Sequence, residues 1–249
     1  MALSLTERAV ETLRGLSSGD VDKAIAHVRT EGFLLHDPSV SRGVAGLREL
    51  AARSTGGGDA LEVARTIEDG AAVVIHARSG DAVVFAVFRF EKALVAELWW
   101  FTAPAAPSNR SGHSQTDGPV RPDPGVDTAA ARMLVRAYYE TVHIAGRHEQ
   151  IDRFMSGDRQ IRHEPGVRDG VDAFRTDLAV LTRDRTIDDM VLLAAQGDFV
   201  FIAARGTHAG EPCAYIDLYR VEANQLVEHW GFPQAIPSQE MARNPESFL

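Results

Sequence analysis

The chain has 249 residues, a length that suits one large domain or two domains of about 120 residues each. Hydrophobic residues make up 45% and charged residues 24%, the balance of a globular protein that buries its own core. The formal net charge is −9 and the sequence has no run of Lys or Arg, so we expect no nucleic-acid partner. Cys213 is the only cysteine, which excludes an intrachain disulfide and a thiolate metal cluster.

The sequence starts MALSLTERAV, which lacks the charged-then-apolar pattern of a signal peptide. No apolar run approaches the ~18 residues expected of a membrane-spanning helix. We therefore expect a cytoplasmic protein with no membrane partner.

An internal repeat divides the chain. HDPSVSRGVAGLR (36–48) aligns with HEPGVRDGVDAFR (163–175), and FRFEKALVAELWW (88–100) aligns with YRVEANQLVEHWG (219–231). The order and spacing of these matches predict a tandem duplication, with one short insertion near 207–212. We expect domains at 1–104 and 127–249, joined by a Pro/Gly/Ser-rich linker at 105–126.

The first repeat begins with helical signals. Ser4 and Glu7 have the spacing of a capping box, and Asp20 is placed to cap a second, short helix. A third helix is expected at 43–53. The period then becomes that of strands, which we predict at 61–68, 71–78, 82–91 and 94–102.

The second repeat follows the same order. Asp127 is the expected N-cap of a helix, another helix is expected at 170–182, and a short strand ends before Pro165. Helices followed by an antiparallel meander predict an α+β fold, in which three helices pack on a curved sheet around a cone-shaped cavity. The expected strands are 186–195, 198–206, 212–222 and 225–233, and the expected apolar face of the first helix is Leu134, Ala137, Tyr138, Thr141 and Ile144.

The second repeat resembles the SnoaL-like polyketide cyclases of the nuclear transport factor two-like superfamily. Three segments carry the resemblance: IRHEPGVRDGVDAF (161–174), DLYRVEANQLVEHWGFPQ (217–234) and NPESFL (244–249). It covers most of 127–249 and is weaker over 5–102. It implies an apolar pocket, and relatives that include cyclases, isomerases, dehydratases and non-catalytic binders.

Many members of that family are homodimers that pack sheet to sheet. The resemblance therefore implies an intramolecular pseudo-dimer, possible further homodimerisation, and a hydrophobic small molecule as the ligand. The family places its acid/base Asp where this chain has Gly231, so its reaction does not transfer intact.

Strand alternation selects candidate residues in the second repeat. Asp217 lies on one strand face with Tyr215 and Tyr219, and His229 shares a face with Gly231. With the resemblance, these side chains point into the pocket and His163 lies at its wall or mouth. A His and an Asp in an apolar cavity can move a proton beside a carbonyl, with the Tyr215 hydroxyl near the oxyanion. The candidate catalytic residues are Asp217, His229 and His163, and the candidate substrate-binding residues are Tyr215, Tyr219, Trp230, Tyr138 and Phe174.

Each candidate has a structural alternative. His163 can simply bond loop backbone, Asp217 can pair with an Arg across the sheet, and His229 can be an ordinary buried histidine. Trp230 can fill a core or an interface. No His, Asp and Glu set has ligand spacing, so we expect no metal, and no motif indicates a cofactor.

The first repeat has Ala86, Leu98 and Trp100 at the positions of Asp217, His229 and Gly231. Its pocket is therefore expected to be degenerate. The sequence favours a cofactor-free cyclase, isomerase or dehydratase that acts on a polyketide-like molecule in secondary metabolism. A non-catalytic binding protein of the same fold and a protein-association module are the alternatives.

Overall fold

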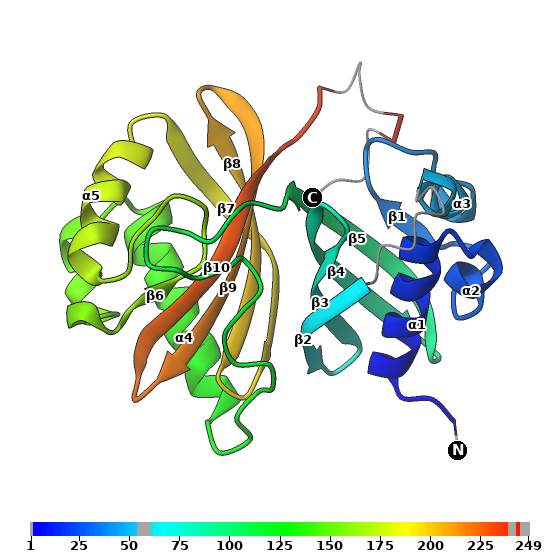
Figure 1. The fold of residues 1–249 in the computed structure, drawn as a ribbon, viewed down its shortest axis with the longest axis horizontal. Coiled ribbons are helices and arrows are strands. Elements are labelled where there is room, and N and C mark those ends of the chain that lie inside the picture. The colour runs from blue at the N-terminus through cyan, green and yellow to red at the C-terminus, as the bar shows by residue number, and fades with distance from the viewer. Residues whose placement is uncertain (1, 54–60, 239–242, 245–249) are drawn as a thin grey trace. The chain divides into compact units, whose positions relative to one another are not determined.

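A computed structural model describes residues 2–53, 61–238 and 243–244 (Figure 1). Within that range the chain forms two compact units. Unit 1 contains the residues up to Pro104 together with 236–238 and 243–244, and unit 2 runs from Ala105 to Ala235.

Unit 1 is an α+β fold with one mixed sheet. Its strand order is β1-β5-β4-β3-β2, in which β1 runs parallel to β5 and the other neighbours are antiparallel. The elements are α1 (Leu5–Ser18), α2 (Val21–Ile25), β1 (Leu34–His36), α3 (Gly43–Arg53), β2 (Leu61–Asp69), β3 (Ala72–Ser79), β4 (Ala82–Glu91) and β5 (Leu94–Pro104).

Unit 2 has the same topology, with the order β6-β10-β9-β8-β7 and β6 parallel to β10. Helices α4 and α5 lie against one face of its curved sheet (Figure 1). The expected α+β fold with two similar units is thus confirmed. The elements are α4 (Thr128–Tyr138), a π-helical turn η1 (Tyr139–Ile144), the 3₁₀ turns η2 (His148–Arg153) and η3 (Gly157–Arg159), β6 (Ile161–Arg162), α5 (Val171–Leu181), β7 (Arg185–Gln196), β8 (Phe199–His208), β9 (Glu211–Glu222) and β10 (Gln225–Ala235).

Local signals set the helix starts, as the sequence predicts. Ser4 and Glu7 form a complete capping box at α1. Asp20 accepts a hydrogen bond from the backbone of Lys23 at α2, and Asp127 caps α4 in the same way. These caps satisfy N–H groups that the first helical turn leaves without partners.

The predicted apolar face of the first helix in unit 2 is offset from the observed one. Ala137 and Ile144 are exposed, whereas Val135, Tyr138, Tyr139 and Val142 are buried. The buried residues have the i, i+3, i+4, i+7 spacing of a helix face, which continues from α4 into the π-helical turn η1. This face points two consecutive tyrosines, Tyr138 and Tyr139, into the interior.

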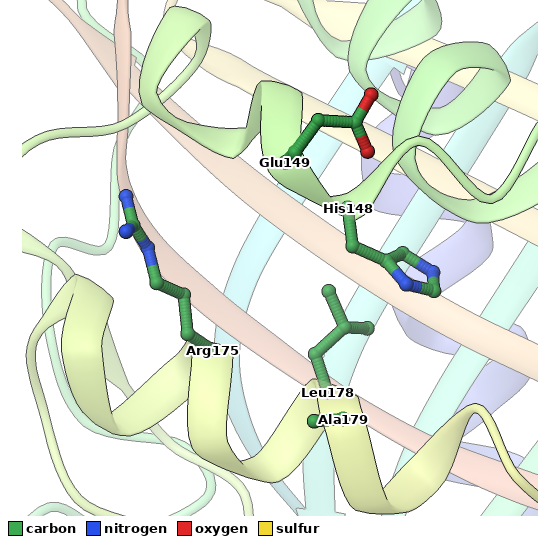
Figure 2. Close-up of a pocket in the computed structure, with 5 residues that line it drawn as sticks. All are labelled: His148, Glu149, Arg175, Leu178 and Ala179. Atoms are coloured by element: carbon green, nitrogen blue, oxygen red, sulfur yellow. The ribbon is translucent and has the colours of Figure 1, made fainter.

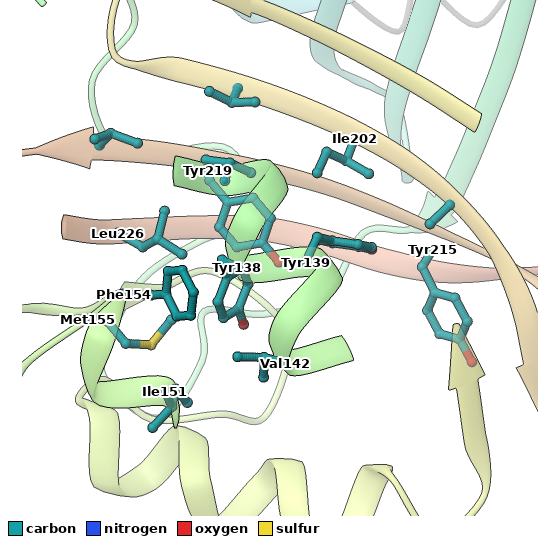
Figure 3. Close-up of a cluster of buried hydrophobic side chains, with 14 of the residues drawn as sticks. Tyr138, Tyr139, Val142, Ile151, Phe154, Met155, Ile202, Tyr215, Tyr219 and Leu226 are labelled. Carbon is teal, nitrogen blue, oxygen red and sulfur yellow. The ribbon is translucent and has the colours of Figure 1, made fainter. Parts of the chain in front are cut away.

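Each unit has its own hydrophobic core between helices and sheet. In unit 2 the core is rich in aromatic rings, and Figure 3 shows Tyr138, Tyr139 and Tyr219 gathered between α4 with its π-helical turn and the sheet. Aliphatic side chains such as Ile202 and Leu226 pack around these rings. Burying such large side chains contributes roughly 1.5–3 kcal/mol each.

The segment 105–126 has no regular secondary structure and belongs to unit 2. Asn109 donates to the Arg162 carbonyl at 2.6 Å, which anchors the segment beside β6. Asn244 donates to the Leu35 carbonyl of unit 1 at 2.7 Å, beside β1. Within the described ranges, the structure contains no helix with the length and hydropathy needed to cross a membrane.

Candidate functional site

Asp217 and His229 form a buried pair inside unit 2. They lie on the adjacent antiparallel strands β9 and β10, with the His229 Nε2 atom 2.8 Å from Asp217 Oδ1. Asp217 is 9% exposed and His229 is 7% exposed, so solvent barely reaches either side chain. The structure therefore brings together two of the three residues that the sequence nominates for catalysis.

The second oxygen of Asp217 accepts a hydrogen bond from Tyr139. The Tyr139 hydroxyl lies 2.5 Å from Asp217 Oδ2, and it reaches this position because Tyr139 shares the buried helix face of Val135 and Val142. Burial, together with the nearby Asp217 carboxylate, raises the pKa of Tyr139 well above its usual value. Tyr139 therefore stays protonated and donates to Asp217 throughout the working pH range.

Glu164 contacts the other side of the His229 ring. Its Oε1 atom lies 3.0 Å from His229 Nδ1, and the guanidinium of the buried Arg162 lies 3.1 Å from the same carboxylate. Arg162 also bonds Asp177 of α5 at 2.5 Å. Burial opposes ionisation of Glu164, but His229 and Arg162 outweigh it and hold the pKa of this carboxyl below its usual range.

His229 thus lies between two carboxylates. Burial disfavours the charged ring, but the Glu164 charge and the hydrogen bonds to Asp217 and Glu164 are stronger and raise the pKa of His229 to about 9. The ring is therefore an imidazolium at neutral pH. With Tyr139 and Arg162, these residues make one continuous network, Arg162–Glu164–His229–Asp217–Tyr139, called the proton network below.

Gly231 leaves the space that the Asp217–His229 pair needs. It pairs with Asp217 across the β9–β10 ladder. A Cβ atom at this position would lie 2.6 Å from Asp217 Oδ1 and 3.1 Å from His229 Nε2, closer than a carbon atom can approach the carboxylate oxygen. A carboxylate is therefore present at this point of the sheet, although β9 supplies it and β10 does not.

Aromatic rings enclose the proton network. Tyr219 stacks on the His229 ring with centroids 4.5 Å apart, and Tyr138 meets Tyr219 edge-on at 5.5 Å. Phe174 of α5 is buried, and the Arg162 guanidinium carbon lies over its ring, 5.1 Å from the ring centroid. Three of the nominated substrate-binding residues thus surround the network.

Tyr215 shares this strand face but not the network. Its hydroxyl donates to the Thr207 carbonyl at 2.6 Å, and the Arg185 guanidinium lies over its ring at 4.5 Å. Figure 3 shows Tyr215 apart from the other tyrosines. Its hydroxyl is consequently occupied away from the position at which the sequence placed an oxyanion.

His163 and Trp230 lie on the opposite face of the sheet from the proton network. Their rings stack with centroids 4.5 Å apart, and His163 Nε2 lies 2.9 Å from Glu228 Oε1. His163 Nδ1 also lies 2.8 Å from the Ser114 carbonyl, so this histidine does bond loop backbone, as its structural alternative held. The alternation of side chains along β6 explains the placement, because Arg162 takes the inner face and the next residue takes the outer one.

A hollow on the surface of unit 2 lies between η2 and α5 (Figure 2). It measures about 240 Å³. None of its lining residues belongs to the proton network. His148 and Glu149 line it from η2, and Arg175, Leu178 and Ala179 line it from α5.

Sequence reasoning missed Tyr139, Glu164 and Arg162. Arg162 and Glu164 carried a usable signal, because they flank His163 and are expected on the face opposite it. Tyr139 carried one as well, since Val135, Tyr139 and Val142 share one helical face, but the predicted apolar face was a neighbouring one. The network is suited to moving a proton within a nearly dry site, because it holds one acid, His229, beside one carboxylate, Asp217.

No family model matches the chain, and neither does any curated protein. Among solved structures, a proposed polyketide cyclase from Acidithiobacillus ferrooxidans aligns at a TM-score of 0.37 and 18% identity, over 42% of this chain and 88% of its own. A proposed ketosteroid isomerase from Kribbella flavida gives 0.39 and 17%, over 46% and 88%. An NTF2-like protein from Burkholderia xenovorans gives 0.37 and 14%, over 44% and 93%. Each match covers less than half of this chain, and none assigns it a function.

Proposed function

We propose that unit 2 is a cofactor-free acid/base enzyme of the cyclase, isomerase or dehydratase type. Its substrate would be a hydrophobic, polyketide-like carbonyl compound, as the resemblance to SnoaL-like proteins implies. The observation that carries the proposal is the buried Asp217–His229 pair, which lies among tyrosine rings and is held by Glu164 and Tyr139. A secondary-metabolic role is part of the same proposal.

Asp217 is the group that takes the proton from carbon. Its carboxyl group lies beside the His229 imidazolium, and removal of a proton next to a carbonyl leaves an enolate. His229 then balances the negative charge that forms, while Glu164 and Arg162 keep the ring oriented. Return of the proton from Asp217 to a second carbon completes an isomerisation, and its return to a leaving hydroxyl completes a dehydration.

Gly231 fits this proposal although it replaces the acid/base residue that the resemblance implies. The Asp217 carboxylate lies against Gly231 and would clash with a side chain there. We propose that the acid/base carboxylate has moved from β10 to the neighbouring strand β9. Glycine at position 231 then leaves room for the Asp217 carboxylate, and it does not indicate that the site has been lost.

Deuterium exchange tests the chemistry without knowledge of the substrate. Apolar cyclic ketones such as the tetralones are incubated with the protein in D₂O, and loss of the proton beside the carbonyl is followed by NMR. The wild type is expected to exceed the buffer rate, and Asp217→Asn is expected to lower the enzymatic rate by about 10²–10⁴-fold. His229→Gln is expected to act in the same direction.

His208→Gln and His36→Gln are matched controls, because His208 is exposed in unit 2 and His36 lies in unit 1. Both are expected to exchange at the wild-type rate. Full activity in an Asp217→Asn, His229→Gln double variant would exclude these residues as the acid/base pair.

Non-catalytic binding is the second candidate function. It is favoured by the occupied hydroxyl of Tyr215, which donates to the Thr207 carbonyl and leaves the expected oxyanion position without that donor. In the same experiment this function predicts broadened or shifted ketone signals with no exchange above the buffer rate. Association with another protein lacks a specific observation in its favour.

The common topology of the two units supports an origin by tandem duplication, which we also propose. The intramolecular pseudo-dimer stays a prediction from the sequence. Light scattering of the purified chain checks it, since an obligate assembly of two chains would contradict it.

A further inference from the structure

We infer that His113, Asp117 and His163 form a binding site for a divalent transition-metal ion of the zinc class. The site lies on the face of the unit 2 sheet opposite the proton network. It would fasten segment 105–126 to the end of β6.

The three side chains converge from two parts of unit 2. His113 and Asp117 come from segment 105–126, and His163 directly follows β6. Asp117 Oδ1 lies 2.6 Å from His163 Nδ1, Asp117 Oδ2 lies 3.6 Å from His113 Nδ1, and the potential ligand atoms all lie within 4.8 Å of one another. An ion bound at about 2.0–2.2 Å from each ligand holds the ligand atoms within about 4.4 Å of one another, which small rotations of the His113 and Asp117 side chains would supply.

The far nitrogen of each histidine faces a carboxylate. His113 Nε2 lies 3.1 Å from Asp169 Oδ2, and His163 Nε2 lies 2.9 Å from Glu228 Oε1. Histidines that bind metal ions almost always donate their other N–H to such a group, which fixes the tautomer and raises the basicity of the ligating nitrogen. Here that arrangement leaves both Nδ1 atoms directed at Asp117.

The ligand chemistry selects the kind of ion. Two imidazole nitrogens and one carboxylate suit Zn²⁺ and its neighbours, whereas Mg²⁺ and Ca²⁺ prefer oxygen ligands. The Ser114 carbonyl lies 2.8 Å from His163 Nδ1 and is a further oxygen at the site. It or a water molecule would complete a tetrahedral set.

Unit 1 offers an internal comparison. His36 there contacts Glu97 at 3.2 Å and stacks on Trp99, as His163 contacts Glu228 and stacks on Trp230. Among the residues that the structure describes, however, only the unit 2 position gathers a third potential ligand. His113 and Asp117 on segment 105–126 are therefore the residues that would make His163 a metal ligand.

Calorimetric titration of the chelator-treated full chain with ZnCl₂ tests the site. The wild type is expected to bind one equivalent of Zn²⁺, and Co²⁺ is expected to give visible bands of a tetrahedral site. His113→Ala and Asp117→Asn are expected to abolish this binding, while His208→Ala leaves it intact. His113 and Asp117 are 30% and 44% exposed in their side chains, so their removal is expected to leave the circular dichroism spectrum unchanged.

Asp169→Asn gives a finer test, because Asp169 would not contact the ion and would affect it only through its hydrogen bond to His113. The loss of that carboxylate is expected to weaken Zn²⁺ binding about 10-fold to 100-fold. Undiminished binding in His113→Ala, or the absence of saturable binding in the wild type, would overturn the proposal.

Proteolysis reports whether the ion fastens the segment. Arg110 is exposed and lies three residues before His113, so trypsin is expected to cut after it more slowly with Zn²⁺ present. The protection is expected to vanish in His113→Ala. Equal cleavage with and without the ion would show that Zn²⁺ does not hold the segment in place.

Discussion

The two units share one sheet topology but differ inside the sheet, at the place where unit 2 holds Asp217. In unit 2, Asp217 pairs across the ladder with Gly231, and in unit 1, Ala86 pairs with Trp100 at the corresponding place. In each pair one side chain is larger than the other. The larger one is Asp217 on β9 in unit 2, but in unit 1 it is Trp100 on β5, the strand that corresponds to β10. The same scaffold thus holds either a carboxylate or an indole there.

On the opposite face of the sheet, the two units have the same residues and contacts. His36, Glu97 and Arg89 of unit 1 make the same contacts as His163, Glu228 and Arg220 of unit 2. This arrangement is present whether or not the interior is polar, which indicates a structural role in joining the first strand to the last two. The shared residues therefore maintain the fold, and the divergent interior residues are the ones expected to determine function.

Transplanting the unit 1 pair into unit 2 should have the largest effect. Asp217→Ala with Gly231→Trp removes the carboxylate and fills its space, so we expect ketone exchange to fall about 10²–10⁴-fold. Deuterium exchange followed by NMR measures it, and circular dichroism monitors the fold. Wild-type exchange in this variant would end the functional distinction between the units.

The reverse transplant should destabilise unit 1. Ala86→Asp with Trp100→Gly places a carboxylate beside Leu98, where no histidine compensates it, and removes a large ring that packs against the core. We expect a loss of about 3–5 kcal/mol in the free energy of unfolding. Urea denaturation measures it, and a loss below about 1 kcal/mol would show that the unit 1 interior tolerates a polar pair.

The shared outer-face histidines should differ in their stability effects. His163→Ala leaves Glu228 with Arg220 as its charged partner, and Glu228 is only 2% exposed, so a loss of about 2–3 kcal/mol is expected. His36→Ala should cost about 1 kcal/mol, because Glu97 is more accessible. Thermal unfolding of both variants, without added metal, tests this ranking, and the opposite order would contradict it.

The titration of His229 should give the smallest change. Its raised pKa means that the protonated ring stabilises the fold fully below about pH 6.5, and that this contribution is lost as the pH rises through about 9. NMR of the ring is expected to show a midpoint near 9, which Glu164→Gln should lower towards 6.5. A wild-type midpoint near 6.5 would remove the imidazolium from the proposed mechanism.

Much of the scaffold could be predicted from the sequence because it depends on local signals. Caps at Ser4, Asp20 and Asp127 start helices wherever they occur. Strand alternation likewise grouped Asp217 with Tyr215 and Tyr219, and His229 with Gly231, since side chains on a strand point to opposite sides in turn. These features need no knowledge of distant residues.

Segment 105–126 illustrates what composition leaves open. Its Pro, Gly and Ser residues correctly indicate a lack of regular secondary structure, but they do not reveal which surface it packs against. Its packing depends on hydrogen bonds to residues far away in the sequence. Asn109 donates to the Arg162 carbonyl, and the Trp230 indole N–H donates to the Asp117 carbonyl at 3.0 Å. The candidate metal site on this segment consequently had no spacing signal.

The sequence by itself determined the α+β fold, the similarity of the two halves and the residues that share a strand face with Asp217 and with His229, because caps, periodicity and alternation are properties of neighbouring residues. Only the tertiary structure decided what surrounds that pair. The packing of α4 and η1 against the sheet brings Tyr139 to Asp217, the β6–β10 pairing brings in Glu164, and Gly231 makes the space. These depend on how separate elements pack, where the energy gained by satisfying a buried charge outweighs local preference.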